Sequence, residues 1–562
     1  MTDSRSDSPS APRSRRRRAA AREAGPTRWP ILLVLLVLVA GGVVVQRHQD
    51  SAPATVAAVS PDGLLPTAAA PGAASSTWYC AGGTATGQSS GAAEQTVQIA
   101  NDSGAALTAR LTVFPSGASP VERDEAVAAH SRTDVVVSSI VKAPYAAALV
   151  EVAGGEVAVS HLLEGPTGRA AAACSSAPSA SWSIPSGTSR AGTSQLLALF
   201  NPFPSAAVLG VTFEADDGAR TPQDFEAVVV PGQSVTVLDI GAKVTLRSQL
   251  ATTVTVRSGR VIVDQIQTAD GTQGTAKSLT VTPGAPRGAP TWWFADGPAD
   301  SGASTVFYVQ NPTDQPADVE LQIRLDDTAS YGQVEPFQVT VGAGRYQAID
   351  VTGDGRVPAG VASTAVARST SGVDIVADRV VSYASPAAPV GATVTLGSPV
   401  LARRWIVPAA SLTSASAVKI IVANPSATDP VTMTVSTVAG GKVTALPGMT
   451  GIQVLAGGRG GFDVPTGAKQ PEVAVDVSGG SGGVVEAVIV FSTGGRAAAL
   501  AVPVSGTNAV ASAGLPVASP GGSGAGGSGG LNGVGDLGTV PAGDTTPRGT
   551  EGTLPPGTGT GR

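Results

Sequence analysis

The amino-acid sequence predicts an all-β protein: four tandem Ig-like antiparallel β-sandwich repeats that follow one N-terminal transmembrane helix. Three observations support this fold class. Short stretches rich in Val, Ile and Thr alternate apolar and polar residues, turn-forming residues interrupt them every 8–12 residues or so, and three landmark residues recur four times in register. Outside the predicted membrane segment, no stretch keeps the 3.6-residue period of an amphipathic helix.

The composition narrows the class of protein before any motif is considered. The chain has 562 residues, of which 14% are charged, 4% aromatic and 42% hydrophobic. Because charged residues fall well below the usual ~25%, a charge-driven disordered chain, a nucleic-acid binder and a charged coiled coil are all poor fits. At roughly 100–200 residues per domain, a chain of this length is expected to hold several domains.

The N-terminal residues carry a membrane signal. Residues 1–28 form a basic, arginine-rich tail, and residues 29–46 form an uncharged apolar run near the minimum length for a helix that crosses a ~30 Å hydrocarbon core. Since the arginines precede this run, the positive-inside rule places the N-terminus in the cytoplasm and the rest of the chain outside. Residues 47–74 are expected to form a linker. A cleaved signal peptide and a secreted protein are the alternative, because Ala52-Pro53-Ala54 has the form of a cleavage site.

A tryptophan, an asparagine and an aspartate mark four successive units. The Trp lies near the start of each unit, the Asn follows 19–23 residues later in a turn setting, and the Asp closes an alternating strand. The three sets are Trp78, Trp182, Trp292 and Trp405; Asn101, Asn201, Asn311 and Asn424; and Asp134, Asp239, Asp350 and Asp463. Because all three landmarks keep their register, we interpret the units as copies of one another. The Asn is expected to bond its own turn, and the Asp to cap exposed backbone groups.

The landmarks set the domain boundaries. We predict repeats at residues 75–175, 176–284, 285–400 and 401–516, each with about seven strands, and a disordered Gly/Pro/Ser/Thr-rich tail at residues 517–562. A unit of ~105 residues is too long for one four-stranded propeller blade and long enough to bury a core of its own. Both a rod and a folded-back arrangement of the units fit these boundaries.

The third unit carries the clearest motif, TWWFADG…FYVQNPTDQPADVELQI…AIDV…VVSYA. This motif resembles a repeat of secreted bacterial surface proteins. The whole chain, with its basic tail, apolar segment, Trp-Tyr-Cys opening and repeats, resembles a family of uncharacterised actinobacterial single-pass envelope proteins over roughly residues 75–516. The second and fourth units keep only the landmark residues. The resemblance implies an extracytoplasmic location and a β-sandwich fold, and it brings no catalytic residues.

Cys80 and Cys174 lie at the two ends of the first unit and are the only cysteines. In an exported protein such a pair favours a disulfide, with two free buried thiols as the alternative. The bond would close a loop of about 94 residues and, in the chain-entropy model, stabilise the protein by roughly 4–5 kcal/mol.

No constellation of residues indicates catalysis, a cofactor or a metal. We interpret the acidic pairs Asp216-Asp217 and Asp326-Asp327 as hairpin turns, because calcium needs several carboxylates in one loop and the first and fourth units lack the pair. His130 and His161 lie near Ser131, Ser160 and Asp134 in the sequence, but no GxSxG elbow accompanies them.

Trp293 is the candidate ligand-contact residue. The four landmark tryptophans are expected to fill the cores of the sandwiches, whereas Trp293 is an additional ring that the repeat does not require.

Repetition without a catalytic constellation favours a non-enzymatic, membrane-anchored envelope scaffold or binding protein, accessory to the assembly of envelope glycans. Its expected partners are envelope proteins or polysaccharide, and no nucleic-acid partner is expected. Residues 29–46 are expected to anchor the protein in the cytoplasmic membrane. One alternative is a glycan-processing hydrolase, which needs two carboxylates ~5–10 Å apart in a cleft. The other is an array of carbohydrate-binding modules, which requires Trp293 to be exposed.

Overall fold

Antiparallel strands are the dominant secondary structure of the computed structural model, which confirms the all-β class. It describes residues 63–87, 91–387, 389–407, 415–464, 472–491, 494–506 and 508–510, all within one compact unit. The predicted basic tail, the membrane segment at residues 29–46 and the C-terminal tail lie outside the described residues. Within the described ranges, no helix is long and apolar enough to cross a membrane.

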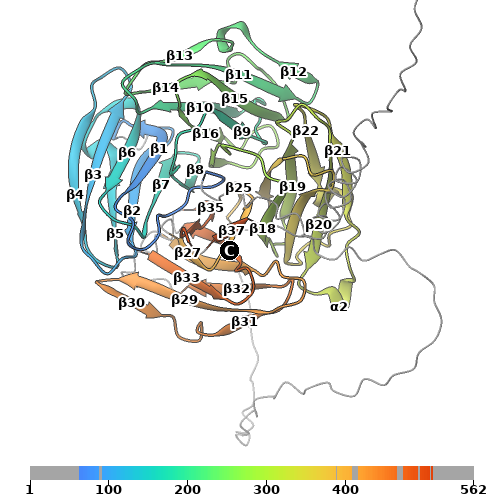
Figure 1. Cartoon of the computed structure of the whole chain (residues 1–562). Helices are drawn as coiled ribbons and strands as arrows, with labels where there is room; N and C mark the ends of the chain where they lie inside the picture. The colour runs from blue at the N-terminus through green and yellow to red at the C-terminus, as the bar shows by residue number, and fades with distance from the viewer. Residues whose placement is uncertain are drawn as a thin grey trace, which may run out of the picture. The chain divides into compact units, whose positions relative to one another are not determined.

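The sheets follow one another along the chain in pairs (Figure 1). We call the two sheets of a pair the companion sheet, which holds the strand with the landmark Trp, and the axial sheet, whose last strand approaches the last strands of the other pairs.

The first pair has its companion sheet in the order β4-β3-β6-β1 and its axial sheet in the order β5-β2-β7-β8, joined by a parallel contact between Thr84 and Glu94. Its elements are β1 (Ser76–Ala85), β2 (Glu94–Asn101), β3 (Leu107–Pro115), β4 (Val121–Val127), β5 (Ser131–Val136), η1 (Val137–Ser139), β6 (Ala143–Val152), β7 (Val157–Gly165) and β8 (Gly168–Ala173).

The second pair has the companion order β12-β11-β15-β9, with β13 also on β11, and the axial order β14-β10-β16-β17. Its elements are β9 (Ser181–Ile184), β10 (Thr193–Asn201), β11 (Ala207–Ala215), β12 (Gly218–Arg220), η2 (Gln223–Phe225), β13 (Val228–Val230), β14 (Ser234–Asp239), β15 (Leu250–Ser258), β16 (Ile262–Ala269) and β17 (Ser278–Pro283).

The third pair has the companion order β21-β20-β23-β18 and the axial order β22-β19-β24-β25. Its elements are β18 (Thr291–Gly297), β19 (Ala303–Gln310), β20 (Ala317–Leu325), α2 (Thr328–Tyr331), β21 (Phe337–Val341), β22 (Tyr346–Asp350), α3 (Val351–Asp354), β23 (Ser363–Ser369), β24 (Val376–Tyr383) and β25 (Gly391–Leu396).

The fourth pair has the companion order β30-β29-β33-β27-β36, with β31 also on β29, and the axial order β32-β28-β34-β35; β26 pairs separately with β37. Its elements are β26 (Val400–Ala402), β27 (Arg404–Val407), β28 (Ala415–Ala423), β29 (Val431–Ala439), β30 (Lys442–Ala445), β31 (Ile452–Val454), β32 (Arg459–Val464), β33 (Glu472–Ser478), β34 (Val484–Phe491), β35 (Arg496–Leu500), β36 (Val502–Pro503) and β37 (Asn508–Val510).

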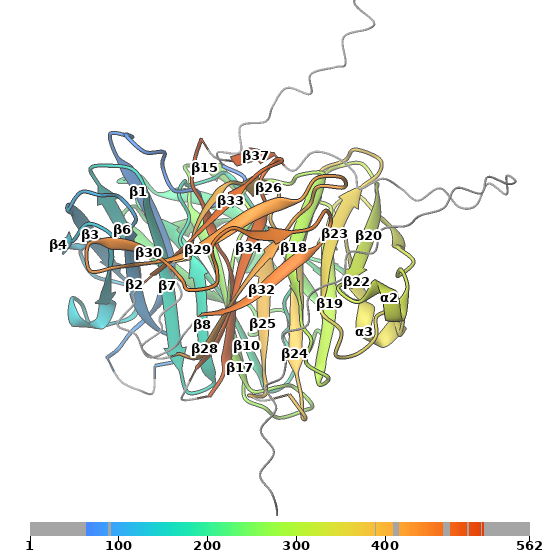
Figure 2. The same ribbon diagram turned by 90° about the horizontal axis from the view of Figure 1, so that it is seen from below.

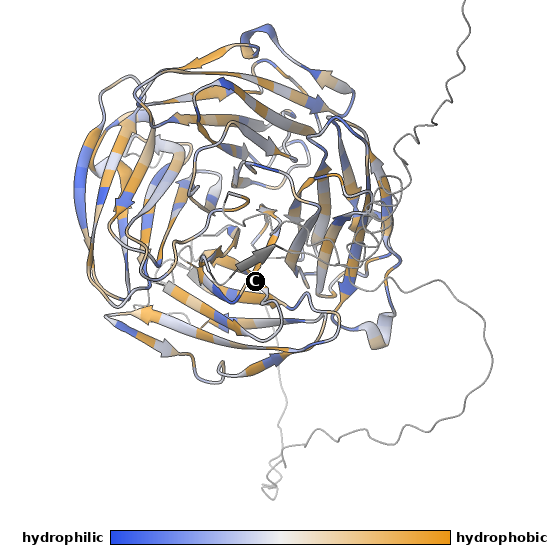
Figure 3. Cartoon of the chain, in the orientation of Figure 1, coloured by the Kyte–Doolittle hydropathy of each residue, from blue (hydrophilic) through white to orange (hydrophobic). Residues whose placement is uncertain are grey.

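The landmark tryptophans pack in the cores, as predicted. Trp78, Trp182, Trp292 and Trp405 are each at most 1% exposed. Three of their indole N–H groups donate to backbone carbonyls, for example Trp182 Nε1 to the carbonyl of Val261 at 3.0 Å. Apolar and polar residues alternate along most strands, as Figure 3 shows, because one face of each sheet lies in a sandwich core.

The landmark asparagines make the same set of hydrogen bonds in all four places, which confirms the predicted turns. In the third pair the Oδ1 atom of Asn311 accepts the backbone N–H of Thr313 at 3.0 Å. Its Nδ2 atom donates to the carbonyls of Gln315, Val341 and Gly342 at 2.6, 3.0 and 3.1 Å. Each asparagine therefore ties its own turn to the end of a later strand of the companion sheet, which is β4, β13, β21 or β31. The remaining members of the set are Asn101, Asn201 and Asn424.

The four sheet pairs close into a ring around the strands β8, β17, β25 and β35 (Figures 1 and 2). These strands approach closely: an added Cβ at Gly168 would lie 3.1 Å from the backbone nitrogen of Leu279, and one at Gly495 would lie 3.8 Å from that of Arg169. The cores are also continuous, since one buried cluster includes residues of both the third and the fourth pairs. The sequence was compatible with both a rod and a folded-back arrangement of the units. In the structure the sheet pairs contact one another and form a closed ring.

A strap formed by residues 63–70 crosses one end of the ring. Ala68 forms a parallel bridge with Val504, next to β36, and its N–H donates to the carbonyl of Pro503 at 2.9 Å. The carbonyl of Ala69 accepts the N–H of Glu156 at 2.9 Å, from the first pair. The strap therefore contacts both the first and the last sheet pairs.

Candidate functional site

Buried acidic residues recur at one register position of the axial sheets. Asp264 on β16, Asp378 on β24 and Glu486 on β34 lie opposite Ala198, Tyr308 and Ile421, respectively. Each of these partners stands three residues before a landmark asparagine. Asp264, Asp378 and Glu486 are at most 2% exposed. Since a buried carboxylate is costly without hydrogen-bond partners, its recurrence indicates a definite structural task.

Each carboxylate accepts a backbone N–H from the preceding sheet pair. Asp264 Oδ2 accepts from Ala81 at 3.2 Å, Asp378 Oδ2 from Ser186 at 3.1 Å, and Glu486 Oε1 from Ala295 at 2.7 Å. The donors lie in, or just beyond, the strand that carries the landmark Trp. The carboxylates therefore join the first pair to the second, the second to the third and the third to the fourth.

His161 and Asp264 face each other between the first and second pairs. The distance from Nε2 to Oδ2 is 3.7 Å, which is within reach of an ion pair but too long for a hydrogen bond. Burial lowers the pKa of His161 to about 4 and raises the pKa of Asp264 to about 7. Both shifts favour the uncharged forms, so we interpret this contact as a neutral pair at moderately acidic pH rather than a salt bridge.

Asp378 lies in a polar network between the second and third pairs. Besides the N–H of Ser186, its Oδ2 atom accepts the Ser186 hydroxyl at 2.5 Å. Burial raises the pKa of Asp378 to about 7, and the two bonds from Ser186 oppose that rise. Gln265 donates to the carbonyl of Ser186 at 2.9 Å and accepts from Gln195 at 2.7 Å. The network holds Ser186 by both its N–H and its carbonyl.

Arg379 and Glu486 form a buried ion pair between the third and fourth pairs. Arg379 Nη2 lies 2.8 Å from Glu486 Oε2, and the side chains are 1% and 0% exposed. Burial raises the pKa of Glu486, and the charge of Arg379 opposes that effect. Arg459 adds a second contact at this interface, with Nη1 3.1 Å from Asp296 Oδ1.

The structure confirms the disulfide between Cys80 and Cys174. It joins β1 to the residue that follows β8 and thereby links the two sheets of the first pair. Both cysteines are buried, and the bond is a structural link within the core.

Trp293 does not have the exposure that a carbohydrate-binding array requires. Its side chain is 6% exposed and packs against residues of the fourth pair, among them Leu401, Ile421 and Val484. The indole of Trp293, which the repeat does not require, is therefore explained by its contact with the fourth sheet pair.

The other residues singled out from the sequence have separate partners. His161 faces Asp264, Ser160 donates to Gln98 at 3.3 Å, and Asp134 pairs with Arg132 at 2.7 Å, so these residues do not assemble into a triad. Of the four landmark aspartates, two have the predicted capping bond: Asp239 and Asp350 accept backbone N–H groups three residues on, at 3.2 and 2.7 Å.

The acidic pairs are engaged by protein groups. Asp217 pairs with Arg220 at 2.7 Å, Asp326 pairs with Arg459 at 2.9 Å, and Asp327 accepts the backbone N–H of Ser330. Among the residues whose positions are described, no group of three or more His, Cys, Asp or Glu side chains could hold a metal ion.

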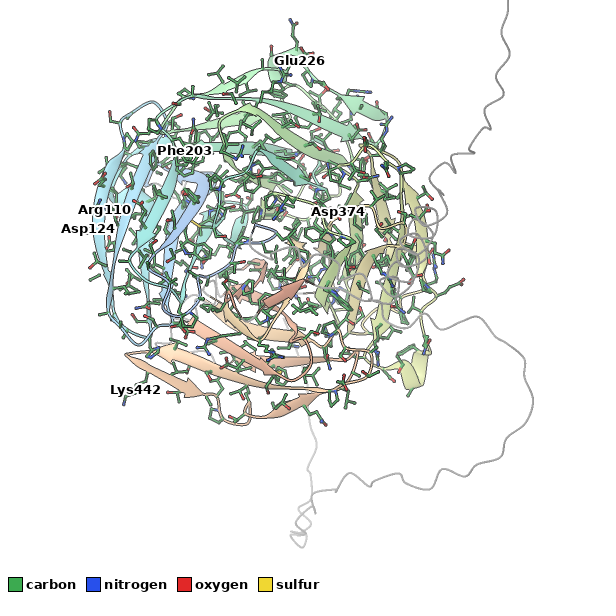
Figure 4. All side chains as sticks on the ribbon, viewed as in Figure 1. Arg110, Asp124, Phe203, Glu226, Asp374 and Lys442 are labelled. Atoms are coloured by element: carbon green, nitrogen blue, oxygen red, sulfur yellow. A yellow bond between two sulfur atoms is a disulfide. The ribbon has the colours of Figure 1, made fainter. Side chains whose placement is uncertain are left out.

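The periphery of the ring carries ordinary surface groups. Arg110 and Asp124, labelled in Figure 4, lie 3.8 Å apart on the outer strands β3 and β4, and both are more than half exposed. At the centre, a cavity of about 50 Å³ lies between the axial strands beneath Leu64 and Leu65 of the strap, lined mainly by alanine, leucine and proline.

The three buried carboxylates were not predicted from the sequence, although a local signal for them exists. Asp264, Asp378 and Glu486 each interrupt a strongly apolar strand, in VIVDQI, IVADRV and VVEAVIV. An acid at the same register of such a strand is expected to have a specific buried partner.

Comparisons with known proteins extend this description only a little. The model of a family of unknown function (DUF5719) matches residues 164–398, which include the second and third sheet pairs, and no curated protein matches the chain.

Among solved structures, the chain is similar to Thermotoga maritima 1070, with 17% identity, 20% of this chain and 94% of that chain covered, and a TM-score of 0.18. It is similar to a tetra-tandem repeat in the extending region of a large adhesion protein, with 11% identity, 75% and 98% covered, and a TM-score of 0.09. It is also similar to Streptomyces avermitilis α-L-rhamnosidase complexed with L-rhamnose, with 13% identity, 78% and 57% covered, and a TM-score of 0.11. TM-scores this low define neither a shared fold nor a function.

Proposed function

We propose that this protein is a non-enzymatic scaffold of the cell envelope, built from four copies of one Ig-like unit and held at the cytoplasmic membrane by residues 29–46. The observation that carries the proposal is where the ionisable groups lie. The ionisable side chains that lie on the axial sheets between neighbouring pairs, His161, Asp264, Asp378 and Glu486, are buried and contact backbone or side-chain partners. A ring whose buried ionisable groups hold its own interfaces suits a platform for other proteins or for polysaccharide.

The disulfide supports the location outside the cytoplasm. Disulfides persist in oxidising compartments and are rare where thiols are kept reduced. Cys80 and Cys174 are bonded, and the arginines that precede the apolar run favour export of all that follows it. The protein would therefore expose the ring on the outer side of the cytoplasmic membrane, with envelope glycan assembly as the process it serves.

The location and the partners can be tested in the same cells. Reporter fusions after residue 62 and at the N-terminus should report opposite sides of the membrane, and N-terminal sequencing of the mature protein should find Met1 or Thr2. Crosslinking followed by affinity purification should recover envelope proteins, or polysaccharide fragments, with the ring. A mature N-terminus near Ala54 would replace the anchored form with a secreted one, and recovery of neither class of partner would contradict the scaffold.

A further inference from the structure

At three of the four contacts between neighbouring sheet pairs, a buried carboxylate accepts a backbone N–H group, and the fourth contact differs. Asp264, Asp378 and Glu486 each reach back to the preceding pair, as described above. The same register position of the first axial sheet, opposite Gln98 on β2, holds Ser160, which has no carboxylate. The contact between the fourth and first pairs therefore lacks the acid that the other three contacts use. It is also the contact at which the last pair meets the first to close the ring.

Two departures from the repeat pattern meet at this fourth contact. The residue after the landmark asparagine is proline in the second, third and fourth units, but it is Asp102 in the first. The residue before the landmark tryptophan is Ser or Thr in the first three units, but it is Arg404 in the fourth. In the structure, Arg404 Nη2 and Nε lie 2.5 and 2.8 Å from the same Asp102 oxygen, Oδ2.

The two side chains of this ion pair differ in their exposure to solvent. The side chain of Asp102 is fully buried, whereas that of Arg404 is 24% exposed and also contacts Asp476 Oδ1 at 2.7 Å. Burial raises the pKa of Asp102, and the charge of Arg404 opposes the rise. Without Arg404, the Asp102 carboxyl would be left buried with no cationic partner.

The strap adds backbone bonds at the same contact. Ala68 bridges Val504 of the fourth pair, and the next residue accepts the N–H of Glu156 of the first pair. Val504 in turn donates its N–H to the carbonyl of Arg404 at 3.0 Å, and Asp102 donates its N–H to the carbonyl of Glu156 at 2.9 Å. The strap and the ion pair thus lie on one continuous set of bonds.

We propose that the contact between the fourth and first sheet pairs is a seam, held by the Arg404–Asp102 ion pair together with the strap, and that the ring opens at this seam before it opens anywhere else. Successive sheet pairs are connected by the chain, whereas the fourth and first pairs are far apart in sequence. The contact that closes the ring therefore depends on interactions that the other contacts do not need. The two substitutions within the repeat supply that contact at the one place where it is required.

Native-state hydrogen exchange of the full chain tests the seam directly. Peptides that contain residues 63–70, 99–104, 401–407 and 502–506 should exchange through an opening that occurs at lower denaturant concentration than the opening of peptides 183–187 and 376–380. Arg404→Gln should speed the exchange of the seam peptides by about 100-fold, because it leaves a buried carboxylate unpaired. The double variant with Asp102→Asn should exchange more slowly than Arg404→Gln alone, because it also removes the buried charge.

Arg345→Gln is the matched control, since Arg345 pairs with Glu214 at 2.5 Å across the contact between the second and third pairs. It should leave the seam peptides unchanged. If Arg404→Gln does not yield folded protein, Asp102→Asn alone provides the comparison, with a smaller acceleration at the same peptides. Equal exchange at all contacts in the unsubstituted chain, or an acceleration by Arg404→Gln that is absent from the seam or uniform around the ring, would overturn the proposal.

Discussion

At the scale of single residues, the landmark asparagines should be among the most sensitive positions of the protein. We expect Asn311→Ala to lower the free energy of unfolding by about 2–4 kcal/mol, because it strands buried backbone groups. The lost partners are the N–H of Thr313 and the carbonyls of Gln315, Val341 and Gly342. Urea unfolding measures the change. The exposed neighbour Asp314 is the control, and Asp314→Ala should stay within about 0.5 kcal/mol of the unsubstituted protein.

Asp378 should make the stability of the protein depend on pH. Burial raises its pKa to about 7 in the folded state, compared with 3.8 for an aspartate in water, so between these pH values the folded state holds a proton that the unfolded state has released. The contribution of Asp378 to stability is therefore greatest below about pH 4, and it declines as the pH rises to about 7, by up to ~1.4 kcal/mol per pH unit. Asp264 should act in the same direction. His161, with its pKa lowered to about 4, should act oppositely below pH 6.5.

The variant Asp378→Asn isolates this effect, because an amide oxygen can still accept from Ser186 and carries no charge. Unfolding by urea at pH 5 and pH 8 should show a smaller loss of stability at pH 8 for Asp378→Asn than for the unsubstituted protein. Equal pH dependence for the two proteins would show that Asp378 does not titrate in this range.

At the scale of elements, the disulfide should stabilise the first sheet pair by linking its two sheets. The bond spans 94 residues, for which the chain-entropy model gives about 4–5 kcal/mol. The paired substitutions Cys80→Ala and Cys174→Ala should lower the free energy of unfolding by about 2–5 kcal/mol, as measured by urea unfolding under non-reducing conditions. Addition of a reductant to the unsubstituted protein should have a similar effect and should leave the double variant unchanged.

Local patterns predicted the elements better than they predicted the contacts between them. The turns at Asn101, Asn201, Asn311 and Asn424, the buried tryptophans and the disulfide could all be predicted, because each depends on residues near in sequence or on a single pair of side chains. The carboxylates at Asp264, Asp378 and Glu486 were missed, because the groups that each contacts lie far away in sequence. Trp293 suggested a ligand contact for the same reason: the neighbours that bury it belong to the fourth pair.

At the scale of the whole molecule, closure into a ring makes the stability of one sheet pair depend on its neighbours. The sequence indicates that ~105 residues suffice to bury a core, but the core of the third pair is continuous with that of the fourth. Trp293, Ala295 and Val366 belong to one buried cluster with residues of β26, β28 and β34 in the fourth pair. The size of a unit therefore does not show that the unit is independent.

A fragment of residues 285–400 tests this dependence. Excision would expose Trp293 and leave Arg379 without Glu486, so a charge that is 1% exposed in the ring would lose its partner. We expect the fragment to lack a cooperative thermal transition in near-ultraviolet circular dichroism, whereas a fragment of residues 285–506, which retains the Arg379–Glu486 pair and the contact around Trp293, should show one. Arg379→Met in the shorter fragment separates the two causes, because it removes the unpaired charge and keeps an apolar side chain of similar length. A cooperative transition in the shorter fragment, at the temperature found for the full chain, would contradict this expectation. It would mean that the sheet pair is stable by itself and that closure of the ring adds nothing to its stability.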